Sequence, residues 1–248
     1  MLQVTNLTKK YGKVLACDDL TFALPDQSIT ILLGPNGAGK STLFKSIIGF
    51  LRVKGSVMID GVYHKELAAK RLCGYVPEIP SLYPNLTVWE HMEFIARAYR
   101  LKNWREWGEE LFTRFELQDK RKKFGDELSK GMQQKLNICL GLLPEPKVLL
   151  LDEPMIGLDP HAIKELKMMI EQMRNDGKTL LVSTHIIDSV DMLWDRTIIM
   201  QDGCIRANIT REELSQDGRT LEQLFFDVTE GVGQNEMVHP EADAPKED

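Results

Sequence analysis

The sequence has no apolar run long enough to cross a membrane, since stretches such as Val148–Leu151 are only a few residues long. Lys9 and Lys10 precede no long apolar segment, so we expect no signal peptide. The four cysteines lack the paired spacing of a metal site, which favours reduced thiols. A net charge of −6 argues against a surface that coats nucleic acid. The chain is therefore not expected to span a membrane, although it could dock on one.

The most informative segment that is present is Gly34–Thr42, with the pattern Gly-x4-Gly-Lys-Ser. It follows an apolar run at Ile29–Leu33 and leads into a helical pattern, which is the context that a phosphate-binding loop requires. Glycines let backbone N–H groups turn toward an anion, and the helix start adds its own unpaired amides. Lys40 would reach the β- and γ-phosphates, and the Ser41 hydroxyl would ligate Mg²⁺. The predicted phosphate-binding residues are Gly34, Pro35, Asn36, Gly37, Ala38, Gly39, Lys40, Ser41 and Thr42.

Ionisable side chains follow two further apolar strands. Val148–Leu151 ends in Asp152 and Glu153, and a buried strand has no structural reason to end in two acids unless a cation or a proton needs them. We expect Asp152 to hold Mg²⁺, directly or through water, and Glu153 to polarise the attacking water. His185, after the next strand, could hydrogen-bond the γ-phosphate and that water, although a lone histidine in such a loop is more often structural.

The arrangement of apolar runs predicts an α/β fold with a P-loop NTPase-type core, a mostly parallel sheet with flanking helices. Short alternating groups near the N-terminus predict an antiparallel β lobe, and helical spacing at about 79–143 predicts an inserted α-helical lobe. We interpret 1–228 as one nucleotide-binding domain. From Glu230 onward six acids face one lysine, so we expect 229–248 to be an acidic, disordered tail.

Four local patterns predict element boundaries. Thr87-x-x-Glu90 forms a capping box before a helix, and Ser129 has the place of an N-cap before another. Arg71–Val76 reads as a short strand. Glu212–Phe226 reads as a single last helix.

Taken together, these residues resemble the ATP-binding cassette ATPases, the nucleotide-hydrolysing subunits of ABC transporters, over roughly residues 2–225. The most specific segment is Leu128–Lys135, which is similar to the signature motif of that family. In the family, the helix start at this motif binds the γ-phosphate of an ATP held by a second cassette. The resemblance therefore implies that Ser129 and Gly131 form a second anion site, and that two cassettes, as a homodimer, associate head to tail around two ATP molecules.

Other motifs of the family have counterparts. Tyr11 has the position of the aromatic residue that stacks on adenine; the alternative is a core tyrosine of the β lobe. Ile156–Asp159 is similar to the D-loop, in which Asp159 would link the two ATP sites. Gly74–Glu78 is similar to the Q-loop, which contacts Mg²⁺ and joins the core to the helical lobe.

The chain departs from the usual family pattern at three positions. Glu78 replaces the usual glutamine; a carboxylate is a good Mg²⁺ ligand, but its charge near the γ-phosphate would slow turnover. Lys130 and Met132 replace a glycine and a glutamine of the signature motif. These changes resemble the ABC-2-type exporter branch and point to export.

The resemblance implies an ATPase that powers a separate transmembrane permease from the cytoplasmic side of the membrane, with no nucleic-acid partner. The permease would dock near the Glu78 loop and the helical lobe. An apolar cluster after that loop would line the docking groove or pack inside the helical lobe, and the sequence leaves both open. The cluster comprises Leu82, Tyr83, Leu86 and Trp89. The alternatives are a soluble ABC ATPase acting on nucleic acid or ribosomes, and a regulatory cassette that does not hydrolyse ATP.

Overall fold

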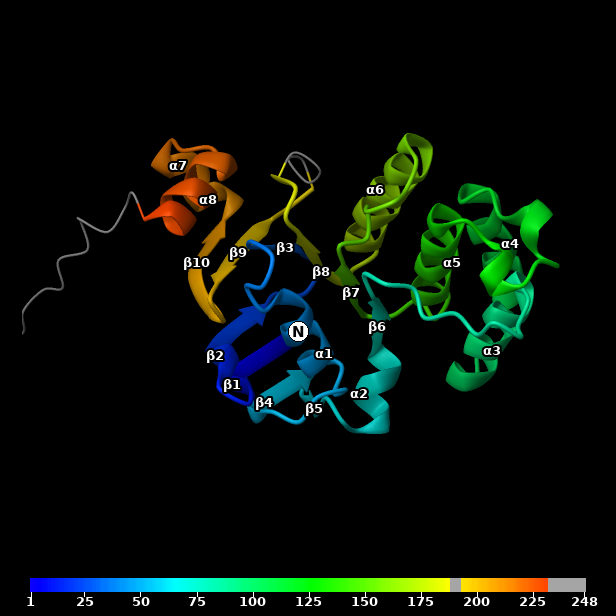
Figure 1. The fold of residues 1–248 in the computed structure, drawn as a ribbon, viewed down its shortest axis with the longest axis horizontal. Coiled ribbons are helices and arrows are strands. Elements are labelled where there is room, and N and C mark those ends of the chain that lie inside the picture. The colour runs from blue at the N-terminus through cyan, green and yellow to red at the C-terminus, as the bar shows by residue number, and fades with distance from the viewer. Residues whose placement is uncertain (188–192, 232–248) are drawn as a thin grey trace, which may run out of the picture.

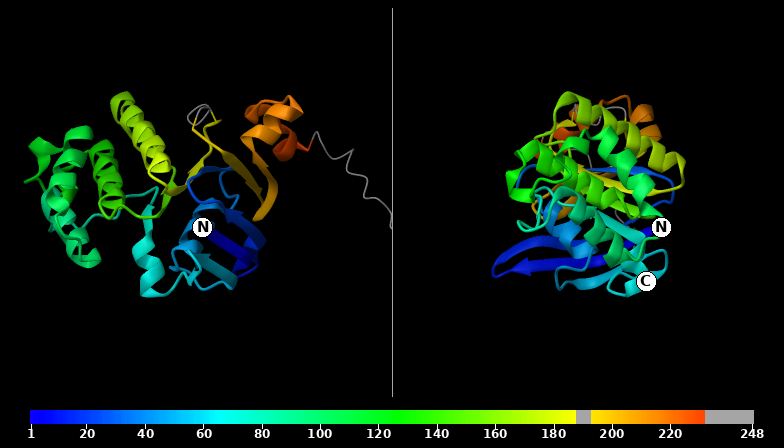
Figure 2. Two further views of the ribbon diagram at one scale, coloured as in Figure 1. Left: turned by 180° about the vertical axis from the view of Figure 1, so that it is seen from behind. Right: turned by 90° about the vertical axis from the view of Figure 1, so that its right-hand side faces the viewer.

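The structure is a computed structural model that describes residues 1–187 and 193–231. Two β-sheets lie side by side, with a helical lobe at one end of the molecule and helices α7 and α8 at the other (Figure 1; Figure 2). The predicted α/β architecture, with a β lobe and an inserted helical lobe, is confirmed. No helix within the described ranges is long and apolar enough to cross a membrane.

The N-terminal β lobe is a four-stranded antiparallel sheet in the order β2-β1-β4-β5. Buried apolar residues in β1 and β2 are interleaved with exposed polar ones, because one face of the sheet packs on the core. A two-residue turn at Asp60-Gly61 connects the last two strands. The strands are β1 (Leu2–Tyr11), β2 (Val14–Leu24), β4 (Lys54–Ile59) and β5 (Val62–Tyr63).

The second sheet has six strands in the order β10-β9-β3-β8-β7-β6, and neighbouring strands are parallel except for β9 and β10. Every residue of β3, β7 and β8 is buried, as expected for parallel strands covered on both faces. The carboxyl ends of these strands therefore meet at one edge. The strands are β3 (Ile29–Leu33), β6 (Cys73–Val76), β7 (Val148–Asp152), β8 (Thr179–Thr184), β9 (Arg196–Gln201) and β10 (Cys204–Thr210).

The two faces of this sheet belong to two hydrophobic clusters, because successive side chains of a strand point to opposite faces. Leu149 and Leu151 pack with the helices of the helical lobe and with α6 (Pro160–Asn175). Leu150 and Leu32 pack with the β lobe and with α1 (Lys40–Ile47). The β lobe and the helical lobe thus pack on opposite faces of the six-stranded sheet.

The helical lobe contains α3 (Val88–Tyr99), α4 (Trp104–Arg114) and α5 (Lys130–Leu142). The predicted capping box at Thr87 is present, since its hydroxyl accepts from the Glu90 N–H while the Glu90 carboxylate accepts from the Thr87 N–H. The predicted N-cap at Ser129 is also confirmed. Two 3₁₀ turns, η1 (Gln118–Lys120) and η2 (Gly125–Glu127), connect α4 to α5.

Two boundary predictions were wrong. The strand expected at Arg71–Val76 is only Cys73–Val76, because Arg71 and Leu72 end helix α2 (Leu67–Leu72). The single helix expected at Glu212–Phe226 is two helices. They are α7 (Arg211–Asp217) and α8 (Leu221–Glu230), separated at Gly218, whose φ of 75° ends the first helix in a left-handed conformation. The expected disordered tail began at residue 229, but residues 229 and 230 are the last residues of α8 and Gly231 is its C-cap. Residues 232–248 lie outside the described residues.

Candidate functional site

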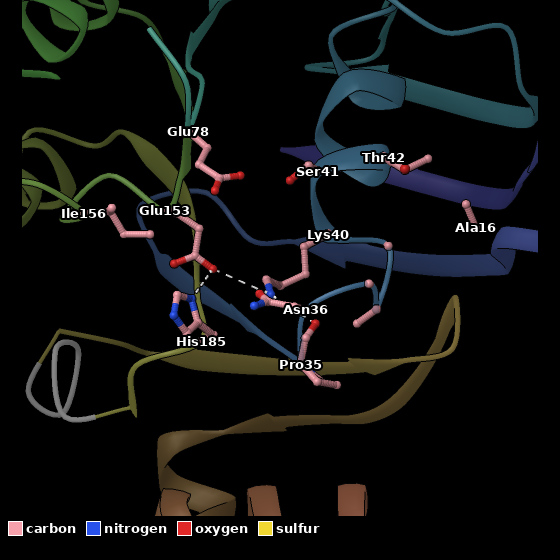
Figure 3. Close-up of a pocket in the computed structure, with 13 residues that line it drawn as sticks. Ala16, Pro35, Asn36, Lys40, Ser41, Thr42, Glu78, Glu153, Ile156 and His185 are labelled. Atoms are coloured by element: carbon pink, nitrogen blue, oxygen red, sulfur yellow. Dashed lines mark hydrogen bonds and ion pairs between the residues drawn. The ribbon is translucent and has the colours of Figure 1, made fainter. Parts of the chain in front are cut away.

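A pocket of about 450 Å³ lies at the edge where β3, β7 and β8 end. Figure 3 shows that its walls come from the glycine-rich loop, from Glu78 after β6, and from Glu153 and His185 after β7 and β8. The structure thus brings together residues that are about 150 positions apart in the chain. The described residues that line the pocket are Ala16, Pro35, Asn36, Gly37, Ala38, Gly39, Lys40, Ser41, Thr42, Glu78, Glu153, Ile156 and His185.

Two glycines of the loop are required by close packing. A Cβ atom on Gly34 would lie 2.4 Å from the Met200 carbonyl oxygen, and one on Gly39 would lie 2.2 Å from the Ala16 carbonyl oxygen. Gly39 also has a φ of 104°, which side chains other than hydrogen rarely allow. No side chain caps the start of α1 in the described structure, so the first amides of that helix can bind an anion.

Three ionisable side chains meet in the pocket, of which Lys40 and Glu153 are buried and His185 is exposed. Oε1 of Glu153 lies 3.6 Å from Nζ of Lys40 and 3.0 Å from Nδ1 of His185. Figure 3 shows these three side chains converging from the loop and from two strand ends. Lys40 Nζ also donates to the Gly34 carbonyl at 2.6 Å. The cluster provides a carboxylate, an imidazole and an ammonium group within reach of one small reactant.

The position of Glu153 is fixed by its backbone. Its φ of 48° is left-handed, and its N–H donates to the Ser183 hydroxyl at 3.0 Å. Only a local constraint keeps a residue other than glycine in such a conformation, and constraints of this kind are frequent at functional sites. The neighbouring strand therefore orients the carboxylate into the pocket.

Asp152 precedes Glu153, is only 1% exposed and is not among the described residues that line the pocket. Its Oδ1 accepts from the Ser183 hydroxyl at 2.7 Å, and its Oδ2 accepts from the Tyr75 hydroxyl at 3.4 Å. Neither Ser183 nor Tyr75 was given a role from the sequence. The signal for Ser183 is its register, because it pairs with Asp152 across two parallel strands.

Two side-chain amides on α5 were also given no role from the sequence. Asn137 Nδ2 donates to the Pro77 carbonyl at 2.8 Å and to the Gln134 side-chain oxygen at 3.3 Å. Gln134 Nε2 donates to the Pro154 carbonyl at 3.2 Å. Both amides are buried, and they attach α5 to the residues that follow β6 and β7. The available signal was a pair of polar residues three positions apart within the apolar face of a helix.

The starts of α5 and α6 carry three further predicted site residues, Ser129, Gly131 and Asp159. None of the three is among the described residues that line the Lys40 pocket. A Cβ atom on Gly131 would lie 2.7 Å from the Gly157 carbonyl oxygen, so the start of α5 packs closely on the loop before α6. Asp159 accepts from the Ala162 N–H at 2.9 Å and pairs with Lys135 at 2.7 Å. The hydrogen bond from Lys135, followed by that from Ala162, lowers the pKa of Asp159.

Tyr11 is not brought into the pocket. It ends β1, 46% of its surface is exposed, and the Lys9 ammonium lies 4.8 Å from its ring centroid. Tyr11 is thus an exposed residue and not part of the β-lobe core. Ala16 of β2 lines the pocket nearby.

A second, more apolar groove of about 430 Å³ runs between the six-stranded sheet and α3. The residues of the apolar cluster after Glu78 lie in two different environments. Tyr83 lines this groove and is exposed, whereas Leu82 and Trp89 pack against the core. Exposed aromatic and aliphatic side chains also line it, namely Phe50, Ile79 and Phe94.

The described residues contain no group of three or more histidines, cysteines or acids that could hold a metal ion by themselves. The pocket does contain hard oxygen donors, since Ser41 and Glu78 face each other across it in Figure 3. Such donors suit Mg²⁺, which usually takes its remaining ligands from water and from substrate phosphates.

Comparison with known proteins identifies the family. Residues 17–156 match the model of the ABC transporter family. The chain is 35% identical to the ABC-type transporter ATP-binding protein EcsA of Bacillus subtilis, over 92% of this chain and 96% of that protein. It is 33% identical to the linearmycin resistance ATP-binding protein LnrL of the same organism, over 90% and 74% of the two chains.

Solved structures agree with this result. The ATP-binding subunit of an ABC transporter superposes with a TM-score of 0.87 at 32% identity, over 92% of this chain and 99% of the other. The dimeric, post-hydrolysis ATP-binding cassette MJ0796 bound to ADP and Pi gives a TM-score of 0.77 at 26% identity, over 85% and 98%. The chain belongs to the ABC transporter family, as one of its ATP-binding, ATP-hydrolysing cassettes.

Proposed function

We propose that Glu153 is the general base of this ATPase, and that the cassette powers an exporter through a separate transmembrane permease. The observation that carries the catalytic part is the contact of the Glu153 carboxylate with both Lys40 and His185. A carboxylate in this position can accept the proton of the attacking water. His185 then orients that water and contacts the γ-phosphate, while Lys40 neutralises phosphate charge.

We assign the phosphate and metal contacts to the glycine-rich loop and the acids beside it. Residues 34–42 would bind the phosphates through backbone N–H groups and the start of α1. Ser41 and Glu78 would hold Mg²⁺ directly, and the burial of Asp152 favours contact through water. Held by these residues, Mg²⁺ would supply positive charge that offsets the negative charge of the phosphates.

A second copy of the chain is needed to complete each ATP site. Ser129 and Gly131 do not line the Lys40 pocket of their own chain, within the part of the structure that is described. At the interface of a head-to-tail homodimer, the start of α5 would bind the γ-phosphate held by the partner. Asp159 would then link the two sites, and Tyr11 would contact adenine from the rim. The dimeric cassette of similar fold supports this arrangement.

The apolar groove beside α3 is the proposed docking site for the permease. Its exposed Tyr83 and Phe94 contact each other edge to face, with 5.1 Å between ring centroids, next to the loop that carries Glu78. Exposed aromatic side chains in a groove are typical of protein interfaces. Docking there would hold the cassette at the cytoplasmic side of the membrane.

The direction of transport is proposed from relatives and motif departures. LnrL is named for resistance to linearmycin, and a resistance function fits a transporter that removes its substrate. The departures from the usual family pattern at Glu78, Lys130 and Met132 resemble the ABC-2-type exporter branch and also point to export.

Phe94→Glu is expected to reduce recovery of a polytopic membrane protein with the tagged cassette at least about tenfold, because a charge replaces an apolar contact in the groove. The measurement is mass spectrometry of proteins that co-purify after gentle solubilisation of native membranes. Phe226→Glu is the matched control, since Phe226 is similarly exposed on α8 at the opposite end of the molecule (Figure 1). Equal recovery with both variants would contradict docking in this groove, and absence of any membrane partner would contradict the transporter role.

A further inference from the structure

The orientation of Asp152 is set by two hydroxyl groups on two different strands. Tyr75 lies in β6, which stands next to β7 at the helical-lobe end of the sheet. Its hydroxyl contacts Oδ2 of Asp152 at 3.4 Å, while the Ser183 hydroxyl contacts Oδ1 at 2.7 Å. Burial, followed by the negative charge of Asp152, raises the pKa of Tyr75. Each oxygen of the carboxylate therefore has its own donor.

The ring of Tyr75 is itself held in place by aromatic neighbours. Its centroid lies 6.3 Å from that of Phe44 in α1 and 6.4 Å from that of Phe50. A tyrosine has few rotatable bonds, so a ring packed in this way fixes the position of its hydroxyl. A carboxylate held at both oxygens keeps one orientation before the ligand arrives, which is the condition for a preorganised site.

We propose that Tyr75 is a positioning residue that fixes the Asp152 carboxylate for the divalent metal bound with ATP. The inference rests on the proposed role of Asp152 in holding that metal. Loss of the Tyr75 hydroxyl frees Oδ2, and the carboxylate must then be ordered each time the metal binds. The phosphate-binding loop does not depend on this hydrogen bond, so ATP affinity in the absence of metal stays the same.

The test measures metal binding directly, with Mn²⁺ as the probe and electron paramagnetic resonance as the readout. The full chain carries Glu153→Gln so that ATP is not consumed, and the chain is kept in the same excess over ATP throughout. Tyr75→Phe is expected to raise the Mn²⁺ Kd about three- to tenfold, as loss of one hydrogen bond predicts. ATP binding without metal is measured in parallel and is expected not to change.

Tyr99→Phe is the matched control. Tyr99 lines the same apolar groove, and its hydroxyl donates at the same 3.4 Å, but to the Cys73 carbonyl. An Mn²⁺ Kd for Tyr75→Phe equal to that for Tyr99→Phe would overturn the proposal, even if the melting temperature fell. Asp152→Asn distinguishes the metal-holding role of Asp152 from the positioning role of Tyr75. If this variant also leaves the Kd unchanged, the metal-holding role of Asp152 fails; if it alone raises the Kd, only the positioning role fails.

Discussion

Glu153→Gln is expected to lose ATP turnover by about 10²- to 10⁴-fold, the usual contribution of a positioned general base, while ATP binding persists. The amide has nearly the same shape as the carboxylate but cannot accept the proton of the attacking water. It also removes a negative charge 3.6 Å from Lys40, so the ammonium is freer to contact phosphate. Phosphate release under steady-state conditions and equilibrium ATP binding measure the two effects separately. If two copies associate around ATP as proposed, they are no longer separated by hydrolysis, and size-exclusion chromatography with ATP should detect a stable dimer.

Glu171→Gln provides the control for this variant, because Glu171 is exposed on α6 and the substitution makes the same chemical change away from the pocket. It is expected to hydrolyse ATP at the wild-type rate. Near-wild-type turnover by Glu153→Gln would refute the assignment of the base. It would also leave the contact between Glu153 and His185 without a catalytic reason.

The sequence predicted the parallel core because the information for it is local. Each central strand is a short apolar run, and the groups that line the pocket follow those runs directly, as Glu153 and His185 do. In a parallel sheet the strand ends must share an edge, so local patterns were sufficient to bring the pocket together. The fold class and most of the pocket therefore follow from the order of residues along the chain.

The remaining features depend on register and on contacts between distant segments. Ser183 and Tyr75 reach Asp152 only because β7 stands between β6 and β8, an order that local patterns do not specify. Asn137 reaches Pro77 across sixty positions of the chain. The division of the last helical segment into α7 and α8, in contrast, does have a local signal in the sequence. Thr220 and Gln223 form a capping box, which marks the start of a new helix.

These distant contacts connect the two surfaces proposed to matter for transport. Tyr75 lines the apolar groove and also donates to Asp152, and Asn137 lines that groove while it holds the carbonyl before Glu78. A permease segment in the groove would therefore touch residues that are one hydrogen bond away from groups beside the ATP pocket. Coupling between transport and hydrolysis requires such short connections between two sites.

Gly39→Ala is expected to weaken ATP binding at least about 100-fold, because an error of about 1 Å in a binding loop can have an effect of that size. The new Cβ atom would lie 2.2 Å from the Ala16 carbonyl oxygen, which belongs to the backbone of β2 and has little freedom to move. The loop must shift instead, and its amides then no longer converge on the phosphates. Titration with a fluorescent ATP analogue measures the loss, and circular dichroism should show an intact fold with a lower melting temperature.

Gly37→Ala distinguishes this steric effect from backbone strain. Both glycines have positive φ, 86° at Gly37 and 104° at Gly39, so alanine is strained at each position by about 1–2 kcal/mol. They differ in space, because a Cβ atom on Gly37 meets nothing within 4 Å. If packing against β2 sets the shape of the loop, Gly37→Ala retains most of the ATP affinity that Gly39→Ala loses. Equal losses would mean that backbone flexibility, and not contact with Ala16, is what the loop requires at both positions.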